Sequence, residues 1–329
     1  MRYGNLDNVK WILTALIVLY HIQFRGGDHE SLFMAIKNLG DCSVPAFAII
    51  SGFLFWRSVR AFANLKWKFV RRIYALLLPY LLWNSINVVI SNLPSIRTQG
   101  VESLLGVNLW DNVILWGASP HFWYIFMLMF WTVLSPILYV AYRNKMCLCI
   151  LLSSQIAYML YKGDSIYHSR YIYMLFTWAG LLGWHFPNLI EKVSSWTPKK
   201  KTAVSASAAA VYFSIYWIYA TLKPGMGLQV WLYGIRAIAL ILAAINLPVL
   251  KIGAITPIRF SFWVFAIHFW CDAYLSGAIF SVIKSPIAYQ LMTWFAVMIL
   301  GLISGALTSK FAPNLFSALT GRRSTAKSI

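Results

Sequence analysis

Apolar runs long enough for a membrane-spanning helix recur along the whole chain and constrain its fold more than any other feature. The 329 residues are 60% hydrophobic and 11% charged, about half the charged share of a soluble domain. Inside a bilayer the backbone amides must be hydrogen-bonded within the protein, which leaves helices and closed barrels. The alternating pattern of barrel strands is absent. We therefore expect an all-α, polytopic membrane helical bundle, which excludes a soluble enzyme.

The spacing of these runs predicts about ten transmembrane helices. Their expected ranges are 9–24, 40–57, 69–91, 121–142, 146–161, 171–187, 203–222, 228–248, 259–281 and 287–309. When the N-terminus is placed in the cytoplasm, most of the 28 lysines and arginines fall in inside segments, as the positive-inside rule requires. Both termini are therefore predicted to be cytoplasmic.

The domain organisation follows from the same pattern. We expect a single membrane domain over 1–329, with a basic, disordered tail at 321–329 and a short interfacial helix at 104–116. The net charge of +19 lies between apolar runs, so it indicates topology and contact with membrane lipids, with no nucleic acid partner. The four cysteines do not have metal-ligand spacing, and we predict no metal site.

A polar stripe marks the first predicted helix. Lys10 and His21 are eleven residues apart, so on a helix they lie within about 20° of the same face. Asp7 and Thr14 share that face. A polar stripe on an apolar helix must face polar groups, and we interpret it as one wall of a site.

His21 is the candidate general base, because imidazole can remove a proton from a hydroxyl near neutral pH. The alternative is a histidine hydrogen-bonded to a neighbouring helix. Asp41 is the nearest acid at similar depth and is predicted to orient His21, although capping a helix would also explain it. In the ninth span, His268 is expected to line the site as a third catalytic residue. Asp272 lies one turn further on, where it could pair with His268, and it is predicted to bind substrate.

Two other segments carry candidate ligand groups. Arg71 and Arg72, with Lys66 and Lys68 before them, crowd the inner mouth of the third span and would suit a phosphate-bearing ligand; a topology anchor on anionic lipid is the alternative. His121 and Trp123 open the fourth span at the outer face, where they would bind substrate or serve only as interfacial belt residues.

Two positions inside spans have structural implications. Arg236 is expected to contact polar or charged groups, because an unpaired cation is energetically costly in an apolar span. Gly52, which follows Ser51 in the second span, is expected to allow a close helix approach.

Five segments together resemble acyltransferase family 3, a family of integral membrane proteins that includes bacterial glycan O-acetyltransferases. LDNVKWILTALIVLYH resembles the family's first-helix motif, in which an Arg or Lys precedes a histidine by ten intervening residues. The other four segments follow in the family's order: VPAFAIISGFLF, FVRRIYALLLPYLLW, HFWYIFMLMF and FWVFAIHF. The resemblance covers essentially the whole chain.

The resemblance implies a bacterial inner-membrane enzyme that transfers an acyl group, usually acetyl, from cytoplasmic acetyl-CoA to a hydroxyl of a cell-surface or lipid-linked carbohydrate. It implies that His21 is the catalytic histidine, that Lys10 is the motif cation, and that Arg71 and Arg72 are donor-side residues. Lys10 stands where arginine is commoner, which loses the bidentate geometry of a guanidinium.

Alternatives remain from two other classes. A transporter or flippase would use the polar stripe to line its pathway. The second alternative is a glycan-assembly enzyme that uses a lipid-pyrophosphate sugar, whose phosphates the inner cations could bind. Glycosyltransferases usually have acidic, metal-binding motifs, and the nine acidic residues of this sequence form no such cluster. Whether His21 is a base or carries the acyl group itself stays open.

Overall fold

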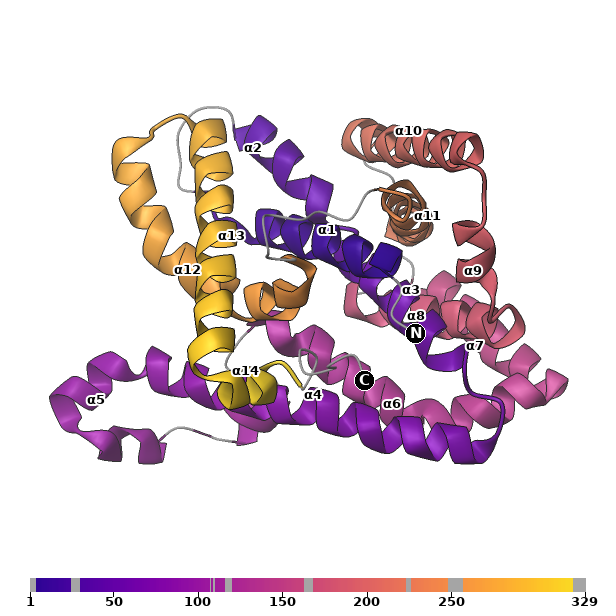
Figure 1. The fold of residues 1–329 in the computed structure, drawn as a ribbon, viewed down its shortest axis with the longest axis horizontal. Coiled ribbons are helices and arrows are strands. Elements are labelled where there is room, and N and C mark those ends of the chain that lie inside the picture. The colour runs from indigo at the N-terminus through magenta and orange to yellow at the C-terminus, as the bar shows by residue number, and fades with distance from the viewer. Residues whose placement is uncertain are drawn as a thin grey trace. The chain divides into compact units, whose positions relative to one another are not determined.

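The computed structural model describes residues 4–24, 30–106, 108, 110–115, 120–162, 168–222, 226–247 and 257–321 (Figure 1). All regular secondary structure in these ranges is helical. The described chain therefore has the all-α architecture expected of a polytopic membrane helical bundle.

Ten helices coincide with the ten ranges predicted as spans. They are α1 Gly4–His21, α3 Ser43–Trp56, α4 Phe62–Ser91, α6 Trp123–Arg143, α7 Lys145–Lys162, α8 His168–His185, α10 Pro198–Leu222, α11 Met226–Ala244, α12 Ser261–Val282 and α13 Pro286–Phe311. Shorter helices stand between or after them: α2 Glu30–Lys37, η1 Asn38–Gly40, α5 Leu93–Gln99, η4 Pro120–Phe122, α9 Leu189–Ser194, η6 Pro257–Phe260 and α14 Pro313–Leu319.

Six helical segments of the described chain are long and apolar enough to cross a membrane, and two shorter apolar helices add to them. The six comprise α2 to α3, α4, η4 with α6, α10, η6 with α12, and α13; the two shorter ones lie in α7 and α11. Helices α1 and α8 are not among them. In α1, the polar residues of the stripe lower the mean hydropathy of the helix. The crossing number and the side of each terminus stay predictions.

The chain divides into two compact units, each assembled from separate stretches of sequence. One unit comprises Met1–Phe62 and Leu138–Ser304, and the other comprises Ala63–Ile137 and Gly305–Ile329. One boundary follows the first residue of α4, and the other two fall inside the long helices α6 and α13. The first unit contains the polar stripe of α1, and the second contains the arginine pair of α4. The prediction of one functional domain stays a prediction.

Within the first unit, α1 is the central helix. It packs against α12, α3, η1 and α11, and Figure 1 shows α1 running between α12 and α11. The α13 side chain Trp294 donates its indole N–H to the Ala15 carbonyl at 2.8 Å. Because α1 is enclosed in this way, its polar stripe faces protein over much of its length.

Glycines let α3 and α8 pack at close range. A Cβ on Gly52 would overlap the backbone carbonyl of Phe176 in α8. In the reverse direction, a Cβ on Gly183 would collide with the backbone of Phe53. The prediction that Gly52 allows a close helix approach is confirmed, and it follows the small-residue packing common between membrane helices.

The segment predicted as one interfacial helix at 104–116 folds differently in its described part. It contains the end of a 3₁₀ segment, Val101–Gly106, and a short π-helical segment, Trp110–Leu115. Residues 107, 109 and 116 lie outside the described residues, as does most of the predicted basic tail. The prediction of a single helix was therefore wrong over the part that is described.

We predict that Gly52→Ala destabilises the protein by about 1–3 kcal/mol, because the new methyl group has no room beside the Phe176 carbonyl. The measurement is the midpoint of thermal unfolding of the detergent-solubilised protein. Gly277→Ala in α12 is the matched control, since its Cβ would meet no atom within 4 Å. Equal midpoints for the two variants would contradict the close-packing argument.

Candidate functional site

Two histidines from distant parts of the sequence meet inside the first unit. His21 ends α1 and is half-buried, whereas His268 of α12 is 1% exposed. Their ring centroids are 5.1 Å apart, and His268 Nε2 lies 3.3 Å from His21 Nδ1. The structure thus brings together two of the three residues predicted to be catalytic.

Backbone carbonyls determine which ring nitrogens carry hydrogen. His21 Nδ1 is 2.9 Å from the Ile17 carbonyl oxygen, and His268 Nδ1 is 2.6 Å from the Phe265 carbonyl oxygen. A carbonyl oxygen only accepts, so we assign a hydrogen to Nδ1 in both rings. In neutral His268, Nε2 then holds a lone pair, and the one Nδ1–H of His21 is shared between this nitrogen and the closer Ile17 carbonyl.

This assignment leaves the Nε2 of His21 without a hydrogen when the ring is neutral. That nitrogen can accept a proton from a hydroxyl, which is the property required of a general base. When it does so, positive charge spreads over the ring, and the lone pair of His268 stabilises the Nδ1–H side. The pair is therefore chemically suited to base catalysis.

Aromatic and apolar side chains surround the histidine pair. The ring of Phe269 lies 4.9 Å from each of the two imidazoles, measured between centroids. Directly after His21, Ile22 joins Phe33 and Tyr289 in a buried apolar cluster. These groups reduce the access of water, which strengthens electrostatic interactions at the site.

Two charged groups complete this neighbourhood. Asp272 is 5% exposed and lies one turn beyond His268 on α12. Lys37, the last residue of α2, interacts electrostatically with both His21 and Asp272. His268 Nε2 lies beside His21 and its Nδ1 lies beside the Phe265 carbonyl, and pairing of His268 with Asp272 stays a prediction.

Other polar side chains of the α1 stripe form part of their hydrogen bonds and ion pairs within α1 itself. Lys10 forms a 3.1 Å ion pair with Asp7, one turn earlier. The Thr14 hydroxyl donates to the Lys10 carbonyl at 2.9 Å. Of the stripe residues Lys10, Thr14 and His21, His21 is therefore the one whose side chain reaches a polar group of α12.

Asp41 has a different partner from the one we predicted. Its carboxylate lies 3.0 Å from Nη1 of Arg236 in α11, and the Arg236 side chain is 1% exposed. The requirement that Arg236 face polar company is met by this pair. The proposed orientation of His21 by Asp41 is not what the structure has, since the polar side chain beside His21 Nδ1 is His268. Because the Arg236 guanidinium is buried, it requires a carboxylate nearby, and Asp41 supplies that carboxylate.

Arg236 and two tyrosines of α10 also hydrogen-bond the backbone of the turn between α2 and α3. Arg236 Nη2 donates to the Asn38 carbonyl at 3.2 Å, and Tyr216 of α10 donates to the Ala35 carbonyl at 2.7 Å. Tyr212 of α10 donates to the Leu39 carbonyl. Three carbonyls at the end of α2 and in η1 are thus satisfied by side chains, as a helix end in apolar surroundings requires.

In the second unit, the two arginines predicted to bind phosphate point in different directions. Adjacent helix positions are about 100° apart. Arg71 is exposed, with its guanidinium 5.0 Å from the Trp67 ring centroid. Arg72 is partly buried and interacts electrostatically with Tyr124 of α6. Of the two, Arg71 is the more accessible to a ligand.

The residues predicted to bind the acceptor at the start of α6 also lie in the second unit. His121 is 4% exposed, and its ring centroid is 4.6 Å from that of Phe122. Trp123 is partly buried, with its ring edge-on to Tyr124. Burial of His121 agrees with a packing role, and substrate binding by either residue stays a prediction.

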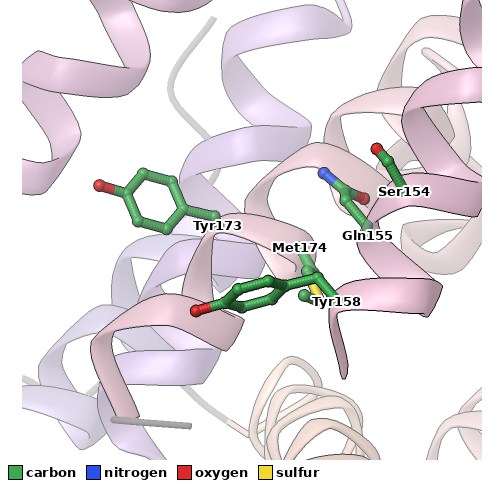
Figure 2. Close-up of a pocket in the computed structure, with 5 residues that line it drawn as sticks. All are labelled: Ser154, Gln155, Tyr158, Tyr173 and Met174. Atoms are coloured by element: carbon green, nitrogen blue, oxygen red, sulfur yellow. The ribbon is translucent and has the colours of Figure 1, made fainter. Parts of the chain in front are cut away.

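A cavity of about 410 Å³ lies between α7 and α8 in the first unit (Figure 2). Its lining residues are Ser154, Gln155, Tyr158, Tyr173 and Met174. Gln155 accepts a hydrogen bond from the indole N–H of Trp178 at 2.9 Å. The lining includes no imidazole, carboxylate or ammonium group, so the cavity does not offer a base for acyl transfer.

Sequence reasoning did not single out Lys37, which lies near the histidine pair through its contact with Tyr20. It ends the short helix ESLFMAIK, which also carries Glu30, and its interaction with Asp272 depends on how α2 packs. Within the described residues, groups of three or more His, Cys, Asp or Glu side chains that could hold a metal ion are absent, and the prediction of no metal site stays a prediction.

We predict that Arg236→Met destabilises the protein by about 3–5 kcal/mol, because it leaves the Asp41 carboxylate buried without its cation. The double variant Asp41→Asn/Arg236→Met should recover part of that loss. Thermal midpoints in detergent measure both effects. As a control, Glu191→Gln removes a half-exposed ion pair to Arg57 and should cost less than about 1 kcal/mol. Equal losses for Arg236→Met and Glu191→Gln would contradict the assigned importance of the buried pair.

Comparison with known proteins supports the resemblance noted in the sequence. The family model described as an acyltransferase domain, that of acyltransferase family 3, matches residues 3–310. Searches of curated proteins and of solved structures found no match. The family match covers nearly the whole chain, including both histidines of the pair. The chain therefore belongs to acyltransferase family 3 and is a multi-pass membrane acyltransferase.

Proposed function

We propose that this protein is an O-acetyltransferase of a bacterial inner membrane. It would take acetyl from cytoplasmic acetyl-CoA and transfer it to a hydroxyl of a cell-surface or lipid-linked carbohydrate. The observation that carries the proposal is the His21–His268 pair, with 3.3 Å between Nδ1 and Nε2, in a chain of this family. That pair leaves a lone pair on His21 Nε2 for the acceptor hydroxyl.

The chemical step begins when His21 Nε2 removes the proton of the acceptor hydroxyl. The hydroxyl oxygen attacks the thioester carbonyl carbon, and the carbonyl oxygen becomes an oxyanion. The C–S bond then breaks and the carbonyl re-forms. The departing CoA thiolate takes the proton from the His21 imidazolium, which gives an O-acetyl ester and CoA thiol.

His268 acts in this proposal as a positioning residue. Its Nδ1–H is anchored to the Phe265 carbonyl, so its Nε2 lone pair is directed at the Nδ1–H of His21. This arrangement holds His21 in the tautomer that has a free Nε2, and it offsets the charge of the imidazolium. Asp41, held by Arg236, is not needed for that role.

The donor and acceptor assignments rest on charge and on the family resemblance. Lys10, Arg71 and Arg72 are the cations we assign to the phosphates of the donor, each on its charge and its place in the family's motifs. Asp272, beside His268, is a candidate for binding an acceptor hydroxyl, and His121 and Trp123 are assigned to the acceptor on their sequence position alone.

A relay mechanism uses the same atom. His21 Nε2 could attack the thioester carbon itself, with CoA leaving, and then pass the acetyl group to the acceptor. A transporter or flippase, the alternative from another class, would have no need for two imidazoles in direct contact. The family match likewise favours acyl transfer over transport.

We predict that His21→Ala abolishes the transfer of labelled acetyl from acetyl-CoA to the membrane glycan fraction. His268→Ala should lower kcat by about 10- to 100-fold, since the base keeps its Nε2 but loses its support. His268→Gln should retain more activity, because an amide oxygen can also accept the Nδ1–H of His21. Wild-type turnover by His21→Ala, at equal protein level, would refute the proposal.

We predict that Arg71→Ala raises the KM for acetyl-CoA by about tenfold, because charge-assisted bonds to phosphate contribute about 1.5–3 kcal/mol. Titration of acetyl-CoA at a saturating level of membrane acceptor gives this value. Arg97→Ala is the matched control, since Arg97 is also exposed and stands in the last turn of α5, which we expect on the outer side. An unchanged KM for Arg71→Ala would remove Arg71 from the donor site.

A further inference from the structure

We propose that Lys37 is a further catalytic residue, whose ammonium group stabilises the oxyanion that forms on the thioester carbonyl. This inference rests on the proposed acyl transfer at His21 and supplies the electrostatic group which that reaction requires. Neither the polar stripe of α1 nor the segments that resemble the family include Lys37.

The position of Lys37 is the first observation. Its Nζ lies 5.6 Å from the centroid of the Tyr20 ring, in a cation–π contact. Tyr20 precedes His21, and the two rings are edge to face with centroids 5.5 Å apart. The ammonium also attracts the Asp272 carboxylate and repels His21 when that imidazole is protonated. Lys37 therefore belongs to the same cluster of groups as the histidine pair.

The rigidity of the Lys37 backbone is the second observation. Side chains of three other helices hydrogen-bond the carbonyls around it: Arg236 to Asn38, Tyr216 to Ala35, and Gln290 of α13 to Phe33 at 3.3 Å. On the opposite side, η1 touches α1, because a Cβ on Gly40 would overlap the Leu16 carbonyl. A residue held in this way is preorganised, which is what makes electrostatic stabilisation effective.

The electrostatic environment of Lys37 is the third observation. Its side chain is partly buried, so its charge is less screened than it would be in water. Asp272, which is 5% exposed, offsets part of the cost of holding the ammonium there. The resulting site presents a cation, a base and a carboxylate around the end of α1.

Lys37 would act without exchanging a proton. As the acceptor oxygen bonds to the thioester carbon, the carbonyl oxygen gains a negative charge that the ammonium attracts. When the C–S bond breaks, that charge returns to the carbonyl double bond and the thiolate receives its proton from His21. Lys37 remains an ammonium throughout, so the step balances without another reactant.

The test uses the purified full-length protein with acetyl-CoA, and water as the acceptor, because the same oxyanion forms during hydrolysis. A thiol reagent follows the released CoA. We expect Lys37→Met to lower kcat on the order of 100-fold with the KM for acetyl-CoA changed by less than about twofold. Lys37→Arg, which keeps the charge, should retain at least about a tenth of the wild-type kcat.

Lys284→Met is the matched control. Lys284 also makes a cation–π contact, 4.7 Å from the Phe280 ring centroid, and the substitution removes the same charge. It should turn over like the wild type. Thermal midpoints of all variants in detergent show whether they are equally folded.

Three outcomes would overturn the inference. A wild-type kcat for Lys37→Met, or an effect on KM alone, would show that Lys37 does not stabilise the oxyanion while acyl transfer stands. A lower thermal midpoint that accounts for the loss, with no rescue by Lys37→Arg, would assign Lys37 to structure. If wild-type protein released no more CoA than His21→Ala, the proposed function would fail and the inference with it.

Discussion

The buried ion pair between Arg236 and Asp41 is the interaction on which the arrangement of the first unit depends. A guanidinium that is 1% exposed in an apolar helix is unfavourable unless a carboxylate and hydrogen-bond acceptors surround it. Asp41 and the Asn38 carbonyl supply both. In return, Arg236 and two tyrosines of α10 satisfy carbonyls of α2 and η1 that would otherwise be buried without donors. The ion pair and the turn therefore stabilise each other.

This turn sets the geometry of the candidate active site. Because η1 is held between α11 and α1, the end of α2 lies beside Tyr20 and His21. From the other side, α12 carries His268 against His21, and α13 anchors α1 through Trp294. The His21 imidazole thus ends a helix that packs against neighbouring helices on several sides. Such support lets a base keep one tautomer and one orientation while a substrate binds and leaves.

The two units divide the predicted chemistry. The histidine pair, Asp272 and Lys37 belong to the first unit, whereas Arg71 and Arg72 belong to the second. Neighbouring arginines on a helix cannot face the same direction, so Arg71 remains exposed while Arg72 turns toward Tyr124. A motif written as adjacent letters therefore contains two different environments. Arg71 is therefore the more accessible of the two to a soluble phosphate ligand.

The sequence by itself determined that the chain is a helical membrane protein, where ten of its helices lie, and that His21 stands out on α1. These features depend on local periodicity and on the cost of exposing backbone to lipid, both of which are written along the chain. It also identified Gly52 as a close-approach position and Arg236 as a cation in need of a partner. Tertiary structure alone decided that Asp41 belongs to Arg236, that His268 supports His21, and that Lys37 joins them. Those pairings join residues up to 247 positions apart, and the choice among several possible partners depends on which helices pack together.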